Sequence, residues 1–330
     1  MPRVRVLEVV RETADACSLV LRPLDCEAMD YRPGQFLTIK LPGGAARCYS
    51  LSSSPVRDDE LKVTVKRTRG GHASNWICDN AVEGAEFEVL RPAGTFVPAG
   101  LDRDLLLLAG GSGITPVLSI LKTVLHAGTG NVTLVYANRD EQSVIFRDEL
   151  VALAAEFPDR FTVVHWLESV QGLPTRGGLL ALVERYTARD AFVCGPAALM
   201  DLAVETLRSA GFPDERINLE RFTSLTRDPF AVFEAGTGDR TELEVLLDGV
   251  TTTVEWPSGA TLLEAAIAGG LDVPYSCREG SCGACACFVR GGTVSFAHNE
   301  VLDDADLADG MVLSCQARPT SPTVQVTFDG

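Results

Sequence analysis

The sequence predicts a multidomain chain: an antiparallel β-barrel, then an α/β domain with a parallel sheet, then a small α+β domain. Three observations support this prediction. Short β-rich runs with turn signals between them fill residues 1–98. Strand-like and helix-like runs alternate over residues 99–222. Residues 241–330 combine strand-like runs, one helix-like run and a cysteine-rich loop. A chain of 330 residues is long enough for two or three such domains.

The predicted barrel is built from short runs rich in β-branched and other apolar residues. Turn signals such as Arg32-Pro33-Gly34 separate them, which is typical of a barrel or sandwich. The strand-like runs are Val4–Val9, Ser18–Leu21, Phe36–Lys40, Leu61–Lys66 and Phe87–Leu90.

The α/β domain begins with Leu105–Ala109, an unbroken apolar run typical of a buried parallel strand. The next run, Ile114–Ala127, has helical periodicity and ends before Gly128. The alternation predicts a parallel sheet with helices on both faces. It continues through strand-like Val132–Ala137, helix-like Phe146–Glu156, strand-like Phe161–Leu167, helix-like Leu179–Tyr186, strand-like Ala191–Cys194 and helix-like Ala197–Ala210.

Residues 223–240 are predicted to form a linker, because Pro229, Gly236 and Gly238 interrupt them and periodicity is lost. The final domain, 241–330, follows this linker. Its expected elements are the strands Leu243–Leu247, Thr251–Trp256 and Val324–Phe328 and the helix Leu262–Ala268.

The net charge of −16 is unevenly distributed along the chain. Residues 241–330 hold 13 Asp and Glu against three Arg, which leaves −10 for this domain. Such acidity argues against nucleic-acid binding. The negative charge would attract a basic protein partner to this domain, or it would only increase solubility. Net charge alone does not distinguish these two interpretations.

Compartment and membrane association are predicted from what the sequence lacks. No uninterrupted apolar run of about 18 residues is present, so no transmembrane helix is expected. The first residues carry charges and no apolar core of a signal peptide, so we expect a cytoplasmic protein.

The cysteine-rich loop carries the most specific pattern in the chain. The cysteines follow C-x4-C-x2-C with a fourth further on, which is the plant-type ligand spacing of a [2Fe–2S] cluster. Gly280 and Gly283 would let the loop curl around a small inorganic core. Disulfides or a zinc site are the alternatives, but a reducing compartment and the absence of paired C-x2-C knuckles argue against them. The predicted metal ligands are Cys277, Cys282, Cys285 and Cys315.

A flavin needs an aromatic face, a hydrogen-bond partner near N5 and a cation for its phosphate. Tyr49, Ser50 and Arg47 offer one of each within four residues, although Tyr49 alone could be an ordinary barrel residue. Further on, Gly71 precedes Ser74 and Asn75 at an expected helix start, where backbone N–H groups can bind a pyrophosphate. An ordinary capped helix is the alternative for this second motif.

Two glycine turns at the ends of strands predict a dinucleotide site. Gly110–Pro116 follows a buried strand and opens a helix, as dinucleotide binding requires. Pro116 replaces the third glycine of the usual pattern, which the first turn of a helix tolerates. Cys194-Gly195-Pro196 lies at another strand end, so Cys194 is expected beside a nicotinamide ring. The alternative for Cys194 is a small buried hydrophobe.

The remaining cysteines show no ligand spacing and are interpreted as structural thiols: Cys17, Cys26, Cys48, Cys78 and Cys287. The four histidines do not cluster in the sequence, so neither a histidine metal site nor a triad is expected.

In their order along the chain, these motifs resemble the ferredoxin–NADP reductase superfamily joined to a C-terminal plant-type ferredoxin domain. Within it, the chain resembles the reductase components of bacterial oxygenases. The resemblance covers nearly the whole chain and implies a β-grasp-like final domain. It rests on Pro33–Phe36, Arg47–Ser50, Gly70–Trp76, Gly110–Pro116, Cys194–Pro196 and the four cysteines of the loop motif.

The resemblance implies an enzyme that takes electrons from NADH or NADPH to FAD and passes them singly through a [2Fe–2S] cluster to a partner oxygenase. That partner would be of the 3-ketosteroid 9α-hydroxylase kind or another ring-hydroxylating or epoxidising system. Ser50, near flavin N5, and Cys194 would hold catalytic positions. The cofactor-binding residues it implies are Arg47, Tyr49, Ser50, Gly71, Ser74, Asn75, Gly111, Ser112, Gly113, Thr115, Cys194, Gly195, Pro196 and Phe222.

Several alternatives stay open at this point. The barrel motif also occurs with FMN, although the Gly70–Trp76 segment favours FAD. Arg139 and Asp140 stand side by side after the second strand, so the sequence does not choose between NADPH and NADH. A stand-alone flavin or quinone reductase and a redox-sensing binding module are the rival functions.

Overall fold

The computed structural model describes residues 1–25, 28–231 and 240–329. Cys26 and part of the expected linker, residues 232–239, lie outside the described residues. Contacts divide the chain into two compact units. The first contains residues 1–39, 48–92 and 96–223, and the second contains 40–47, 93–95 and 224–330. No helix in the part of the chain described is both long and apolar enough to cross a membrane.

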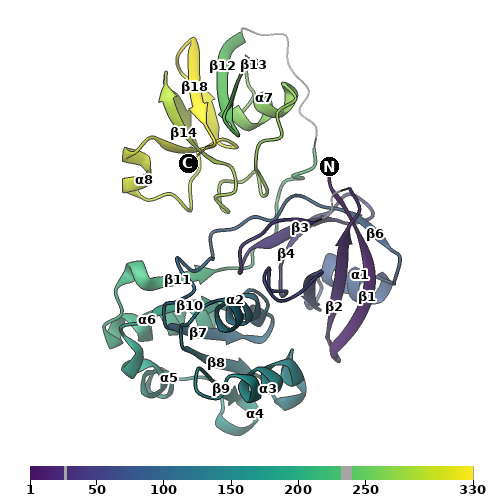
Figure 1. The fold of residues 1–330 in the computed structure, drawn as a ribbon, viewed down its shortest axis with the longest axis vertical. Helices are drawn as coiled ribbons and strands as arrows, with labels where there is room; N and C mark the ends of the chain where they lie inside the picture. The colour runs from purple at the N-terminus through teal and green to yellow at the C-terminus, as the bar shows by residue number, and fades with distance from the viewer. Residues whose placement is uncertain (26–27, 232–239, 330) are drawn as a thin grey trace. The chain divides into compact units, whose positions relative to one another are not determined.

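The barrel forms from two antiparallel sheets, one in the order β5-β2-β1-β6 and the other pairing β3 with β4. Bridges between Ile39 and Val89 and between Leu51 and Val63 join the sheets at both edges. These links confirm the predicted antiparallel barrel (Figure 1). Its elements are β1 (Arg3–Thr13), β2 (Ala16–Pro23), β3 (Phe36–Lys40), β4 (Ala46–Ser50), β5 (Leu61–Lys66), α1 (His72–Asn80) and β6 (Glu86–Glu88).

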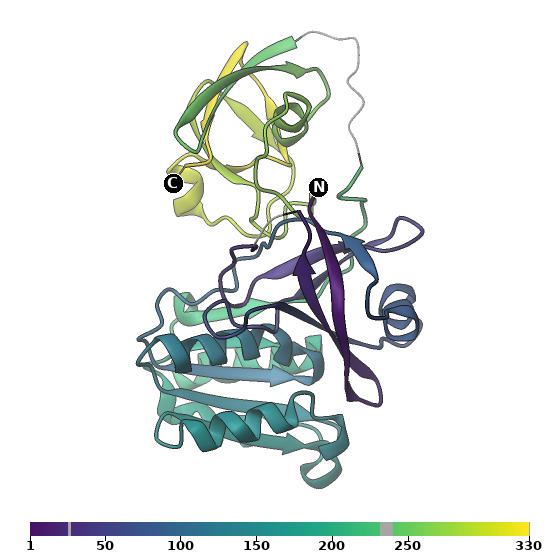
Figure 2. The same ribbon diagram turned by 45° about the vertical axis from the view of Figure 1, so that its right-hand side comes forward.

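The α/β part has a five-stranded parallel sheet in the order β11-β10-β7-β8-β9. Figures 1 and 2 show helices on both sides of it, as the alternation predicts. The strands are β7 (Leu105–Gly110), β8 (Val132–Asn138), β9 (Phe161–Leu167), β10 (Asp190–Cys194) and β11 (Ile217–Glu220). The helices are η1 (Gly111–Gly113), α2 (Ile114–Ala127), η2 (Glu141–Ser143), α3 (Arg147–Glu156), α4 (Glu168–Gln171), α5 (Arg176–Val183), η3 (Glu184–Tyr186), α6 (Ala197–Ala210) and η4 (Asp214–Arg216).

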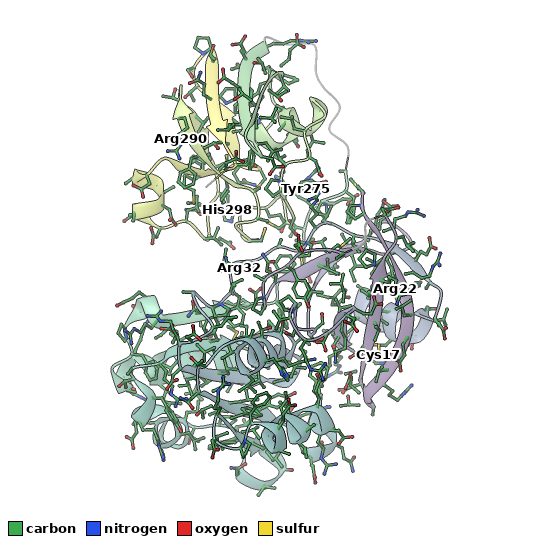
Figure 3. The ribbon with its side chains drawn as sticks, viewed as in Figure 1. Cys17, Arg22, Arg32, Tyr275, Arg290 and His298 are labelled. Atoms are coloured by element: carbon green, nitrogen blue, oxygen red, sulfur yellow. The ribbon has the colours of Figure 1, made fainter. Side chains whose placement is uncertain are left out.

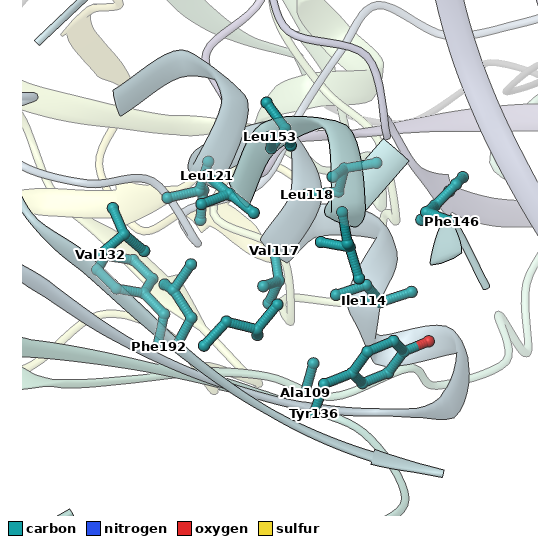
Figure 4. Close-up of a cluster of buried hydrophobic side chains, with 14 of the residues drawn as sticks. Ala109, Ile114, Val117, Leu118, Leu121, Val132, Tyr136, Phe146, Leu153 and Phe192 are labelled. Atoms are coloured by element: carbon teal, nitrogen blue, oxygen red, sulfur yellow. The ribbon is translucent and has the colours of Figure 1, made fainter. Parts of the chain in front are cut away.

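Two hydrophobic cores, one on each face of this sheet, explain why its central strands carry unbroken apolar runs. All residues of β7 and β8 are buried. On one face, the apolar side chains of α2 and α3 pack against the sheet (Figure 4). On the other face, α5 and α6 do the same around Leu106, Met200 and Leu207.

The second unit contains a mixed five-stranded sheet, β13-β12-β18-β14-β16, and a small pair, β15 with β17. Helix α7 packs its apolar face into the core that lines the large sheet. The elements are β12 (Arg240–Leu247), β13 (Val250–Pro257), α7 (Leu262–Ala268), β14 (Ala286–Gly291), β15 (Val294–Phe296), α8 (Asp304–Ala308), β16 (Met311–Leu313), β17 (Ala317–Pro319) and β18 (Thr323–Thr327).

Some elements differ from the sequence prediction. The helix expected at Leu179–Tyr186 begins earlier, because Thr175 accepts a hydrogen bond from the Gly178 amide and caps α5. The edge strand β11 was not predicted, since it carries polar Asn218 and exposed Leu219 rather than an apolar run. Strands β4 and β14–β17 and helix α8 were also not predicted, because they are short or lack clear periodicity.

Helix α2 joins the barrel to the α/β part of the same unit. The Ser119 hydroxyl donates to the Ser53 carbonyl at 2.6 Å. The hydroxyls of Thr123 and Ser54 are 2.8 Å apart. All four residues are fully or almost fully buried, so each hydrogen bond satisfies groups that water cannot reach.

Lys122, also on α2, adds a buried charge to this junction. Its side chain is 6% exposed, and its ammonium group lies 2.6 Å from a carboxylate oxygen of both Asp58 and Glu149. Glu149 also contacts Lys62 of β5 at 3.0 Å. Removing Lys122 would take this cation from Asp58 and leave Glu149 with Lys62 alone.

We therefore expect Lys122→Met to lower the free energy of unfolding by about 2 kcal/mol, because two carboxylates lose their buried partner. Arg22→Met is the matched control, since the Arg22 side chain is 59% exposed in its pair with Glu60. Its loss should change the free energy of unfolding much less, because solvent screens an exposed ion pair. Chemical denaturation followed by fluorescence measures both. Equal shifts in the two variants would contradict the role of Lys122.

Candidate functional site

The two glycine turns predicted for the dinucleotide site interlock at the carboxyl edge of the parallel sheet. Strands β7 and β10 are neighbours, with Ala109 opposite Cys194. A Cβ on Gly113 would lie 2.1 Å from the Cys194 carbonyl oxygen, and one on Gly110 would lie 2.8 Å from Pro196. Glycine is required at both positions because the two turns approach each other closely. The Gly110–Pro116 and Cys194–Pro196 motifs therefore lie side by side.

The polar groups of this turn are oriented by its neighbours. Tyr136 donates from its hydroxyl to the Gly111 carbonyl at 3.0 Å. The buried Thr115 hydroxyl donates to the Ser112 carbonyl at 3.1 Å, so it stabilises the turn. Gly111 adopts φ +50°, a left-handed conformation that suits glycine.

Cys194 lies at the end of β10, directly opposite Glu220 of β11. Burial raises the pKa of Cys194, and the neighbouring Glu220 raises it further, so the thiol is protonated at neutral pH. Burial also raises the pKa of Glu220 to about 7. Two residues further, the Phe222 side chain is 49% exposed.

The predicted flavin residues all lie on β4. Ser50 is buried, whereas Arg47 and Tyr49 are half-buried. The Arg47 guanidinium donates to the Ala46 carbonyl at 2.6 Å. Ser53 and Ser54, shortly after Ser50, hydrogen-bond to α2. These bonds connect β4 to the helix that follows the Gly111–Gly113 turn.

Helix α1 begins directly after Gly71, and no side chain caps its first N–H groups. The Ser74 hydroxyl accepts from the Thr68 amide at 3.1 Å. The Asn75 amide donates to the Gly71 carbonyl at 2.6 Å and to that of Thr68 at 3.1 Å. Both side chains therefore brace the loop, and the exposed helix N-terminus is available to an anion.

A cation at this site was not predicted from the sequence. The ammonium group of Lys66, at the end of β5, would be 3.5 Å from a Cβ on Gly111. Burial lowers the pKa of Lys66, and Asp15 lies 4.0 Å away. Lys66 offered no motif of its own, because its proximity to Gly111 depends on how the barrel meets α2.

The structure also assigns partners to the two residues that left the dinucleotide preference open. Arg139 contacts Asp15 at 2.9 Å. The Asp140 carboxylate caps η2, because it accepts hydrogen bonds from the amide and hydroxyl of Ser143. Both charged groups are thus engaged within the protein.

In the second unit, the four predicted cysteine ligands are buried and form two pairs. Cys277 hydrogen-bonds Cys282, and Cys285 hydrogen-bonds Cys315. These bonds lower the pKa of Cys277 to about 5 and also lower that of Cys315. In each pair, one thiol thus loses its proton more readily than an ordinary cysteine, and the thiolate is the form that binds metal.

Two pairs are the arrangement that a binuclear cluster needs. Among the described residues, no three His, Cys, Asp or Glu side chains converge as a single metal ion requires. A [2Fe–2S] core with four cysteines takes two sulfurs on each iron. The four thiols in two pairs therefore fit this cluster.

The backbone of the loop behaves as its glycines predict. Gly280 and Gly283 have φ of +82° and +70°. The Glu279 amide donates to the Cys277 sulfur at 3.3 Å, and the Gln316 side chain donates to the Cys315 sulfur at 3.4 Å. Hydrogen bonds of this kind tune the potential of an iron–sulfur cluster.

Cys287, two residues past Cys285, lies in the hydrophobic core of this unit. Burial raises its pKa to about 12, as expected for a structural thiol. Cys17 and Cys78, which were also interpreted as structural thiols, place their sulfurs 3.4 Å apart. Their separation in the sequence gives no sign of this contact.

Family models match all three parts of the chain. An oxidoreductase FAD-binding domain matches residues 4–97, an oxidoreductase NAD-binding domain 107–205, and a 2Fe-2S iron–sulfur cluster binding domain 245–320. The solved structure of phthalate dioxygenase reductase aligns over 99% of this chain and 97% of its own, with 25% identity and a TM-score of 0.60.

Curated relatives extend this similarity along nearly the whole length. The ferredoxin reductase component of 3-ketosteroid-9-alpha-monooxygenase from Mycolicibacterium smegmatis is 53% identical over 98% of this chain and 96% of its own. A component of the 1,2-phenylacetyl-CoA epoxidase from Escherichia coli is 35% identical over 98% of this chain and 96% of its own.

We expect Gly113→Ala to raise the KM for the dinucleotide about tenfold, because the new methyl group displaces the Cys194 carbonyl. Stability should fall by about 2 kcal/mol from overpacking. Gly177→Ala in α5, where a Cβ meets nothing within 4 Å, is the control. Steady-state kinetics and denaturation measure both effects. Unchanged kinetics in Gly113→Ala would show that the turn lies outside the binding site.

Proposed function

We propose a function from the premise that this chain belongs to the family of oxygenase reductase components, which join FAD-binding, NAD-binding and [2Fe–2S] domains in one polypeptide. The chain takes electrons from NADH or NADPH and delivers them one at a time to an oxygenase. The observation that carries this proposal is the pairing of four buried cysteines in a domain attached to a flavin- and nucleotide-binding unit. A stand-alone flavin reductase would have no use for these four thiols.

When bound, FAD accepts a hydride and releases electrons singly, and the [2Fe–2S] cluster carries one electron at a time. The protein contributes orientation. We propose that the Gly111–Gly113 turn and Ser112 hold the dinucleotide pyrophosphate, with Lys66 supplying positive charge. Gly195 and Pro196 shape the neighbouring edge, and Cys194 provides a small, uncharged surface for the nicotinamide ring.

On the barrel, we propose that Tyr49 covers the flavin ring and that buried Ser50 donates a hydrogen bond near N5. Arg47 would neutralise phosphate charge, and the N-terminus of α1 after Gly71 would bind the pyrophosphate of FAD. Phe222, half-exposed after β11, is available to cover the ring from the nucleotide side.

The domain limits that we propose are 1–98 for FAD, 99–222 for NAD(P), 223–240 for the linker and 241–330 for the cluster. The family-model matches at 4–97, 107–205 and 245–320 support them. We also propose a cytoplasmic location, since nine free cysteines are present in the described residues and cluster thiols need reducing conditions.

For the partner, we propose an oxygenase of the 3-ketosteroid 9α-monooxygenase kind. The support is 53% identity to a reductase that carries this name, against 35% to the epoxidase component. The −10 charge of residues 241–330 supports docking on a basic surface of that partner.

Cys282→Ser tests the electron route. We expect it to spare NAD(P)H-dependent reduction of ferricyanide, which the flavin can reduce directly, and to abolish electron delivery to the oxygenase. Cys287→Ser is the matched control, because Cys287 lies in the core of the same domain yet outside the two pairs. Absorbance and paramagnetic resonance spectra report cluster loading. Full oxygenase turnover by a cluster-free Cys282→Ser protein would overturn the proposal.

Reconstitution with purified oxygenases tests the partner. Turnover with a 3-ketosteroid 9α-monooxygenase oxygenase component should exceed that with the phenylacetyl-CoA epoxidase components. Raising the salt concentration should slow electron delivery, because it screens the acidic domain from a basic partner. A preference for the epoxidase, or a rate independent of salt, would refute the assigned partner or the electrostatic docking, respectively.

A further inference from the structure

Two cysteines of the barrel meet although 61 positions separate them. The Cys17 thiol, on β2, donates to the Cys78 sulfur, on α1, at 3.4 Å. Cys78 also contacts the Val65 carbonyl at 3.6 Å, and Val65 lies opposite Cys17 in the β2–β5 ladder. Helix α1 therefore packs over this rung of the sheet. Figure 3 shows where Cys17 lies in the barrel.

The two thiols differ in reactivity. The hydrogen bond from Cys17, helped by the charge of Arg67, lowers the pKa of Cys78. The same hydrogen bond and burial raise the pKa of Cys17. The Cys17 side chain is buried, whereas Cys78 is half-buried and reachable from solvent. Cys78 thus combines thiolate character with access, the two properties that make a thiol oxidisable.

The geometry also suits a covalent bond between them. A disulfide needs a sulfur–sulfur distance of about 2.05 Å, so the two sulfurs must approach by a little over 1 Å. Rotation about the side-chain bonds and a small shift of α1 can supply such a movement.

We propose that Cys17 and Cys78 form a redox-active dithiol that hydrogen peroxide converts to a disulfide between β2 and α1. The Cys78 thiolate attacks one peroxide oxygen, the O–O bond breaks, and hydroxide leaves and takes up a proton. The Cys17 sulfur then attacks the resulting sulfenic acid. The S–S bond forms, the S–O bond breaks, and a second water leaves with the Cys17 proton. Two thiols are oxidised by two electrons and one peroxide is reduced to two waters.

The bond would fasten the helix that carries Ser74 and Asn75 to the sheet. Because α1 could then no longer separate from β2, the barrel should unfold at a higher temperature. If the proposed FAD site is also right, the disulfide should slow FAD release by about threefold or more, because it restricts local opening of the helix proposed to bind the FAD pyrophosphate. Only this second consequence rests on the proposed function.

The first test treats the complete, cofactor-loaded protein with one to two equivalents of hydrogen peroxide. After alkylation and trypsin digestion, tandem mass spectrometry should find the peptides containing Cys17 and Cys78 joined, 2 Da lighter than their sum. The same joined peptides should appear in Cys26→Ser, which removes the other cysteine that lies near Cys17 in the sequence. Sulfinic acid on Cys78 without any link, or two unmodified thiols, would overturn the proposal.

Variants test the order of steps. In Cys17→Ser, a sulfenic-acid trap such as dimedone should label Cys78. In Cys78→Ser, Cys17 should remain unlabelled. The reverse pattern would overturn the assignment of Cys78 as the attacking thiol.

The second test measures stability and FAD retention before and after peroxide, with dithiothreitol to reverse the change. The melting temperature of the wild type should rise on oxidation and fall on reduction, while that of Cys17→Ser should not rise. A rise in melting temperature with unchanged FAD release would refute the FAD site near α1 and leave the dithiol intact. An equal rise in Cys17→Ser would refute the disulfide as its cause.

Discussion

The buried junction between α2 and the barrel fixes how β4 and the Gly111–Gly113 turn are placed relative to each other. The N-terminus of α2 follows the glycine turn that we propose for the dinucleotide, and its middle hydrogen-bonds the serines that come directly after β4, the strand that we propose for the flavin. Ser119, Lys122 and Thr123 therefore hold two binding motifs from different domains in one frame. Direct hydride transfer needs reacting atoms within about 3.5 Å, a tolerance that only a rigid junction can maintain.

The buried polar groups at this junction all have hydrogen-bond or ion-pair partners. Buried hydroxyls and the Lys122 ammonium would be costly without partners, and each finds one across the boundary between barrel and sheet. A unit that is joined by buried polar contacts resists sliding, because any shift leaves several groups unpaired at once.

The cysteines of the three parts of the chain differ in how readily they lose a proton. Burial holds Cys194 protonated, which suits the place beside the nicotinamide that we propose for it. The paired cysteines of the last domain have the opposite tendency, because the pKa of one thiol in each pair is lowered. Cys17 and Cys78 form a third arrangement, an unequal pair of thiols within hydrogen-bonding distance in the barrel.

Local sequence determined most of the secondary structure and the cysteine-ligand loop of this protein. The buried strands, the long helices, the four-cysteine loop and its left-handed glycines could all be predicted, because strand burial, helical period and φ preference are properties of short segments. The edge strand β11, the position of Lys66 near Gly111 and the contact of Cys17 with Cys78 could not. Each depends on which surfaces meet after the barrel closes and α2 docks, and residues far apart in sequence carry no periodic or spacing signal of that meeting.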